Sequence, residues 1–131
     1  MRNVLITGGS EGIVGARRVS TELGDLIEQV NTADRHNLTF DYAIDADRNP
    51  SQLYCRSDQY EYARFGIPVT FFTTGLHSDY HQVTDETQYI DYHHMAHVVR
   101  LVEDVAVRVA DLDHRVVVDH PRPDPDAPCR Q

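Results

Sequence analysis

Apolar and polar positions follow one another along the chain in a way that predicts three strands and three helices. Runs of β-branched, aliphatic and aromatic residues indicate strands at residues 3–7, 37–44 and 69–73. Apolar residues that recur every three or four positions indicate helices at residues 15–31, 58–65 and 91–112. Strands and helices therefore alternate, which is the pattern of an α/β fold with helices on the faces of a mostly parallel or mixed sheet.

The third strand raises the question of whether this sheet is complete. The unbroken apolar run at residues 69–73 is typical of a central strand that is covered on both faces. Three strands are few, because sheets have about 5–6 on average, and a small sheet leaves apolar edges open. We therefore expect a three-layer α-β-α arrangement that is an incomplete part of a larger domain. Self-association through an open sheet edge is a further possibility.

The longest helix has one apolar stripe and one polar stripe. The stripe that we expect to be buried comprises Met95, Val98, Val102, Val105 and Val109. His93 and His97 are four residues apart, a spacing that can hold zinc. They lie on the opposite stripe, however, so we expect this pair to be solvated. His36, His114 and His120 lie in loops or near the tail, and the sequence suggests no partner for them.

Residues 1–118 form the predicted domain, and residues 119–131 form a proline-rich tail that is not expected to build a core. The chain has two cysteines, Cys55 and Cys129, which is too few for a disulfide framework. A bridge between them is possible, but the tail position of Cys129 does not favour it.

Composition excludes several classes of function. The 131 residues carry a formal net charge of −9, so the chain lacks the basic footprint of a nucleic-acid-binding protein. No apolar run approaches the roughly 20 residues of a membrane span, so we expect no membrane partner. All twelve basic residues are arginine. The absence of lysine excludes Schiff-base chemistry and lysine-assisted hydride transfer.

The glycine-rich stretch "LITGGSEGIVG", residues 5–15, invites a nucleotide-binding interpretation. It resembles the opening of the short-chain dehydrogenases, and a nicotinamide-dependent oxidoreductase is therefore one alternative. The last glycine of that motif is displaced, with Val14 in its place. The catalytic Tyr-x-x-x-Lys pair of those enzymes is also impossible here. We therefore favour a glycine-rich turn between a strand and a helix.

The stretch "LHSDYHQVTDET", residues 76–87, places two histidines, two aspartates and a glutamate directly after the apolar strand. In open α/β sheets, ligands collect beyond the carboxyl ends of strands. Histidine nitrogen is a zinc ligand, so His77 and His81 are candidate metal ligands. One histidine alone does not make a metal site.

The segment from Arg56 to Met95 resembles the zinc-dependent exopeptidases of the bacterial aminopeptidase and glutamate carboxypeptidase type. The matching elements, in order, are Ser57-Asp58, Gly66-Ile67-Pro68, the strand Val69 to Phe72, Asp79-Tyr80-His81 and Thr84 to Thr87. Gln59 stands where the family often has histidine. The likeness extends more weakly over about residues 3–120.

This resemblance implies a peptide substrate and a site with two zinc ions. His81 matches the last histidine ligand of the family, and Tyr80 would stand on the substrate side. Asp85 and Asp58 would orient the loop or a ligand. An exported parent protein, secreted or periplasmic, is an expectation from resemblance alone.

The other four zinc ligands of such enzymes and their general-base glutamate have no counterpart in this sequence. We therefore expect the chain to be the C-terminal portion of a zinc-peptidase catalytic domain and to be inactive by itself. The alternative is a non-catalytic binding or interaction module with the same fold.

Overall fold

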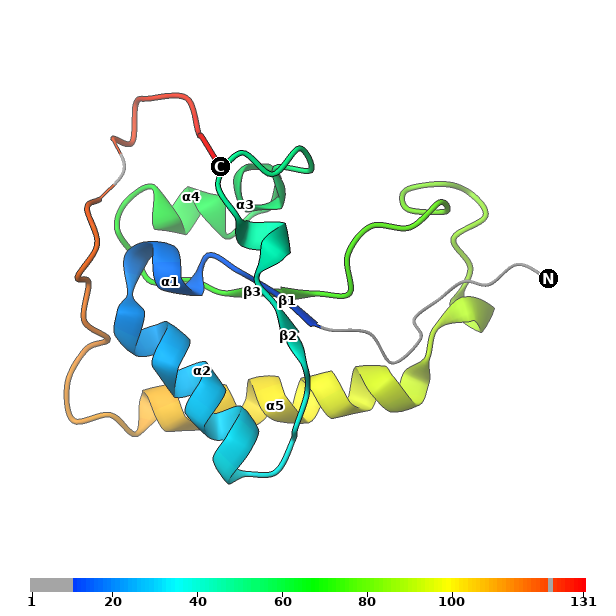
Figure 1. Ribbon diagram of the computed structural model, residues 1–131, viewed down its shortest axis with the longest axis horizontal. Coiled ribbons are helices and arrows are strands. Elements are labelled where there is room, and N and C mark those ends of the chain that lie inside the picture. Colours follow the sequence, from blue (N-terminus) through cyan, green and yellow to red (C-terminus); the bar gives the residue numbers. More distant parts are fainter. Residues whose placement is uncertain (1–10, 123) are drawn as a thin grey trace.

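A three-stranded sheet of mixed direction lies at the centre of the computed structural model, which describes residues 11–122 and 124–131 (Figure 1). Its strands are β1 (Glu11–Val14), β2 (Phe40–Asp41) and β3 (Phe71–Thr73), in the order β2-β1-β3. β1 runs parallel to β2 and antiparallel to β3. This mixed sheet, combined with several helices, confirms the predicted α/β class.

Two of the helices are long, and the residue just before each of them caps its first turn with a side chain. The helices are α1 (Ala16–Val19), α2 (Thr21–Ala33), α3 (Leu53–Arg56), α4 (Tyr60–Ala63) and α5 (Tyr92–Ala110), with 3-10 turns η1 (Ala43–Asp45) and η2 (Thr87–Tyr89). The Ser20 hydroxyl accepts a hydrogen bond from Leu23 N at 3.0 Å. The Asp91 carboxylate accepts one from His94 N at 2.9 Å. Each cap satisfies a backbone donor that a helix start leaves free.

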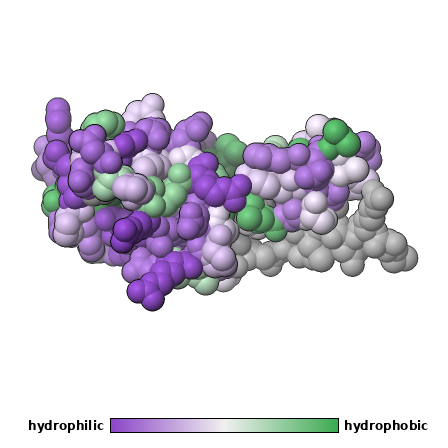
Figure 2. All heavy atoms as spheres, turned by 90° about the horizontal axis from the view of Figure 1, so that it is seen from above, coloured by the Kyte–Doolittle hydropathy of each residue, from purple (hydrophilic) through white to green (hydrophobic). Residues whose placement is uncertain are grey.

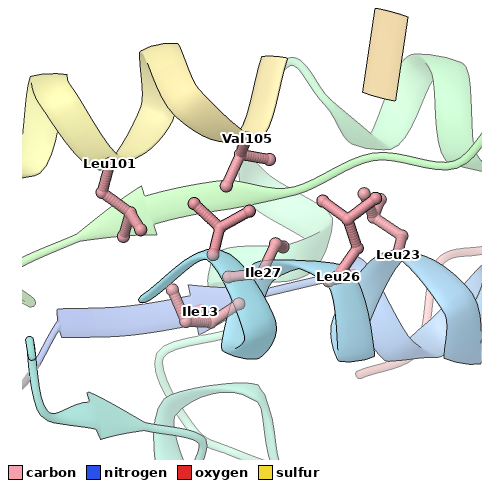
Figure 3. Packing of buried hydrophobic residues seen from close by; sticks show 8 residues of the cluster. Ile13, Leu23, Leu26, Ile27, Leu101 and Val105 are labelled. Carbon is pink, nitrogen blue, oxygen red and sulfur yellow. The ribbon is translucent and has the colours of Figure 1, made fainter. Parts of the chain in front are cut away.

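Successive residues of β1 point into two different cores. Ile13 packs with α2 and α5, whereas Val14 packs with residues of α1, α3 and α4. The first core consists of Ile13, Ala16, Leu23, Leu26, Ile27, Val30, Leu101 and Val105. Figure 3 shows how the side chains of α2 and α5 meet over Ile13. Side chains alternate across a strand, so one short strand separates two helical layers.

The second core is smaller and includes the C-terminal segment. Its buried residues are Val14, Val19, Tyr54, Tyr60 and Ala63. Cys129 packs against it and forms a disulfide with Cys55. The sequence did not favour this bond, because the proline-rich composition of the tail gave no sign that the chain returns to α3. The tail has no helix or strand in its described residues, yet Cys129 and the buried Gln131 contribute to this side of the molecule.

Within its described part, the glycine-rich stretch turns only at Gly15, between β1 and α1, and its earlier residues form a strand. Residues 11–14 form the central strand, while the strand predicted at residues 3–7 lies outside the described residues. A Cβ atom at Gly12 would lie 2.9 Å from the Ile44 side chain and 3.0 Å from that of Thr73. Glycine therefore serves here to let neighbouring segments approach the strand closely.

Among the described residues, β3 is an edge strand, whereas its apolar run is typical of a central one. β3 pairs with β1 and with no other strand among the described residues, and its residues are half-buried. An apolar run indicates a preference for burial, but it does not indicate how many strands lie beside it. The described sheet therefore has open edges at β2 and at β3.

The buried face of α5 differs from the predicted stripe. Leu101 is fully buried and Val105 nearly so, whereas Met95 is 47% exposed and Val102 is 37% exposed. Leu101 belongs to the same core as Ile13 and Ile27. The contact with α2 and β1 therefore turns α5 toward Leu101, a residue that the apolar spacing left out.

The segment after α5 follows the start of α2 and gives two histidines partners that the sequence did not suggest. His114 Nε2 lies 2.7 Å from Glu22 Oε1, and its Nδ1 lies 2.7 Å from Asp113 Oδ1. His120 Nε2 lies 3.0 Å from the Thr21 hydroxyl. Hydrogen bonds to Asp113 and then to Glu22 raise the pKa of His114 above its ordinary value.

A pair of alanine substitutions on α5 tests which face is buried. We expect Leu101→Ala to lower the free energy of unfolding by about 3 kcal/mol, because it leaves a cavity in the first core. Val102→Ala should cost less than about 1 kcal/mol, because that side chain is partly solvated. Urea denaturation measures the loss of unfolding free energy in both variants. A larger loss for Val102→Ala would show that the face of α5 with Val102, and not the face with Leu101, is buried.

The His114 contacts predict a pH dependence of stability. The pKa of His114 is raised in the folded state, so its contacts stabilise the fold fully below the ordinary pKa of 6.5. That stabilisation is lost as the pH rises through the raised pKa. The urea midpoint of the wild type should therefore fall, relative to that of His114→Gln, between about pH 6 and about pH 8. Parallel pH curves for the wild type and His114→Gln would contradict the prediction.

Candidate functional site

The loop from Thr74 to Glu86, which leaves the end of β3, carries most of the predicted site residues (Figure 1). A series of turns shapes it: the main-chain nitrogens of Tyr80, Gln82 and Asp85 donate to the oxygens of His77, Asp79 and Gln82, at 3.1, 2.8 and 3.1 Å. These bonds are local, so the loop is built from its own residues. The first end of the loop is held in place by β3, which is paired with β1 in the sheet.

His81 is exposed and adopts a left-handed backbone conformation with φ +60°. This region is unusual for a residue other than glycine, and such residues gather at functional sites. The imidazole ring stacks on the Tyr80 ring, with ring centroids 4.0 Å apart and planes 14° from parallel. The stack fixes the imidazole at the surface, where a ligand can reach its nitrogens.

Other polar side chains of the loop contact one another. His77 Nε2 lies 3.9 Å from Asp85 Oδ2, and the Thr84 hydroxyl donates to Asp79 Oδ1 at 2.6 Å. The His77 ring also meets the edge of Tyr80, with ring centroids 6.2 Å apart. The loop thus brings Tyr80, His81 and Asp85 together on one segment.

Asp58 occupies a different part of the molecule. It is exposed in the turn before α4, where its main-chain oxygen accepts from Glu61 N at 3.1 Å. In Figure 1, α4 lies to the left of the sheet and the loop lies to its right, beyond the end of β3. No side-chain hydrogen bond of Asp58 within residues 11–122 and 124–131 reaches the loop. The orienting roles assigned to Asp58 and Asp85 stay predictions.

The described residues do not make up a zinc centre by themselves. No group of three or more histidine, cysteine, aspartate or glutamate side chains in this part of the chain is placed to hold a metal ion. A catalytic zinc site uses about three protein ligands. The exposed His81 imidazole fits the chemistry of one such ligand, and the remaining donors are not among its described neighbours.

Two other histidines have carboxylate partners that the sequence analysis missed. His94 Nε2 makes a short hydrogen bond with the buried carboxylate of Glu11, beside a hollow of about 390 Å³ with mostly apolar walls. His36, expected to have no partner, lies 2.7 Å from Asp104 Oδ2. His94 lies seven residues before Leu101, and this spacing is the signal that could have placed it on the buried face of α5.

The start of α1, which the nucleotide-binding interpretation would assign to a phosphate, is already occupied by a carboxylate. Gly15 N donates to Asp45 Oδ2 at 2.9 Å, and Arg18 Nε donates to Asp45 Oδ1 at 2.7 Å. Gly15 itself has φ +92°, a conformation that suits glycine. The glycines thus serve strand packing and a tight turn.

A comparison with protein families shows which family the chain belongs to. The model of Peptidase family M28 matches residues 5–106. The chain belongs to this family. It is a family of zinc-dependent peptidases. By family, therefore, the chain is related to the metallopeptidases, which are hydrolases. Searches of curated proteins and of solved structures found no match.

No helix of the described residues is both long enough and apolar enough to cross a membrane. Hydrophilic residues cover most of the face in Figure 2, and the hydrophobic residues form small separate groups.

The carboxylate at the start of α1 can be tested by substitution. Asp45→Ala should lower the free energy of unfolding by about 2 kcal/mol, because Gly15 N and Arg18 each lose a largely buried acceptor. Asp47, which lies 3.4 Å from Arg18 but is 90% exposed, is the control, and Asp47→Ala should cost less than about 0.5 kcal/mol. Chemical denaturation measures both, and equal losses would contradict the assignment.

Proposed function

We propose that this chain supplies the C-terminal portion of an aminopeptidase-type active site with two zinc ions, and that His81 is one of the zinc ligands. The observation that carries the proposal is the exposed His81 imidazole, stacked on Tyr80 in the loop that follows β3. Its support is twofold: the family match, and the resemblance of the surrounding residues to zinc exopeptidases.

The complete domain would hydrolyse the N-terminal peptide bond of its substrate through a zinc-activated water. Within this chain, Tyr80 would contact the substrate, while Asp85 would orient the loop or a zinc ligand. The remaining zinc ligands and the general-base glutamate would come from polypeptide outside the described residues. The 131-residue chain alone would therefore have little or no peptidase activity.

The outer face of α5 is the surface through which the rest of the domain would dock. Tyr92, Met95 and Val99 are all exposed there. Met95 also lines the apolar hollow between α5 and β3. Among the described residues, β3 pairs only with β1, so a strand added at its other edge would extend the sheet. If this face pairs instead with a second copy of the chain, the chain would behave as a non-catalytic interaction module.

Zinc binding after the missing half is added distinguishes the two possibilities. After dialysis against a weak chelator, the purified chain should retain much less than one zinc per molecule, because one histidine does not hold the ion. Mixing the chain with a separately produced upstream half of an M28 catalytic domain should restore zinc binding. The mixture should also hydrolyse an aminoacyl p-nitroanilide.

Two loop variants show which histidine matters. His81→Ala should abolish the restored activity and reduce the bound zinc, whereas His77→Ala should preserve most of both. Blocking the substrate amine by acetylation should prevent cleavage if the enzyme is an aminopeptidase. Full activity with His81→Ala would exclude the ligand role. One tightly bound zinc in the isolated chain would show that this segment builds a site of its own.

A further inference from the structure

The described residues of the C-terminal segment, 121–122 and 124–131, are held against the second core by an unusual set of contacts. We call this segment the strap. The Gln131 side chain is buried, and it accepts from Tyr54 N at 2.9 Å while donating to Ile44 O at 2.7 Å. The main-chain oxygen of Gln131 accepts from Arg48 N at 2.7 Å. One residue therefore connects the strap to both α3 and the loop before it.

The covalent attachment lies two residues earlier, where Cys129 is bonded to Cys55 of α3. Between Arg122 and Cys129, the described residues of the strap contact the body at few points. Its Pro125 oxygen accepts a hydrogen bond from Arg64, and the Arg122 side chain lies over Gly66. Within its described residues the strap has no regular secondary structure. The disulfide is therefore its strongest attachment.

The strap covers an aromatic hollow. A cavity of about 350 Å³ lies between the strap and the body of the protein. Tyr54, Tyr60 and Arg18 line it from the body, and Pro121, Asp124, Ala127, Pro128 and Arg130 line it from the strap. Displacement of the strap would expose both tyrosine rings, which are buried in the closed arrangement.

We propose that the strap is a redox-controlled cover: the Cys55–Cys129 disulfide locks it closed, and a dithiol reductant releases it. In the exchange, a thiolate of the reductant attacks one sulfur, and a mixed disulfide forms as the Cys55–Cys129 bond breaks. The second thiol of the reductant then displaces the remaining protein thiol, so the reductant becomes a disulfide and both cysteines become thiols. The lock closes in an oxidising compartment, where such bonds persist.

The position of the bond makes this release local and accessible. Cys129 is only partly buried, and it lines an open hollow of about 550 Å³ together with Arg48, Asn49 and Gln52, so the bond lies near the surface. The first core contains no residue of the strap. Reduction should therefore free the strap while α2 and α5 stay folded.

Hydrogen exchange of the native chain tests the proposal. The amides of Tyr54 and Arg48 both donate to Gln131. Reduction with dithiothreitol should accelerate their exchange about tenfold or more, because each loses its acceptor when the strap leaves. The amides of α2 and α5 should keep their protection. Reoxidation should restore the original rates, and Cys129→Ser should reproduce the reduced state without any reductant.

A second variant separates the bond from the side chain that anchors the strap. In oxidised Gln131→Ala, the Tyr54 amide loses its acceptor, but the Arg48 amide keeps the main-chain oxygen and should remain protected. If reduction changes the exchange of Arg48 by less than about twofold, the disulfide is not the lock. If reduction removes the protection of α2 and α5 as well, the bond is a global staple and the proposal fails.

Discussion

The alternation of side chains along β1 is the constraint on which the rest of the structure depends. Ile13 and Val14 are neighbours in the sequence, yet they belong to different cores. The neighbouring strand β3 repeats the division, since Phe72 packs against the first core and Phe71 against the second. Within the described residues, a sheet of three short strands can support helices on both faces because its central strand contributes to each.

The two cores hold together by different means. The first depends on aliphatic side chains from α2, α5 and β1, which are removed from water together. The second is aromatic and smaller, and a disulfide and the polar side chain of Gln131 complete it. This difference lets the C-terminal segment be attached or released while the helices on the opposite face keep their packing.

The candidate site depends on the sheet without being part of it. β1 fixes β3 by antiparallel pairing, and the loop that follows β3 takes its shape from its own turns. His81 is therefore presented at the surface, while its left-handed backbone and the Tyr80 ring define its orientation. Such a side chain is suited to complete a site whose other members lie on a separate element.

The sequence by itself determined the class of fold, the two long helices and the loop that carries His81, because periodicity and residue chemistry are local properties. It also carried the family resemblance, since that rests on the order of short motifs such as Asp79-Tyr80-His81. Tertiary structure decided that Gly12 lies in a central strand, that Leu101 faces the core, and that Cys129 meets Cys55. It likewise paired His94 with Glu11 and His36 with Asp104. Each of these facts depends on a neighbour that is distant in sequence, and no local pattern contains that neighbour.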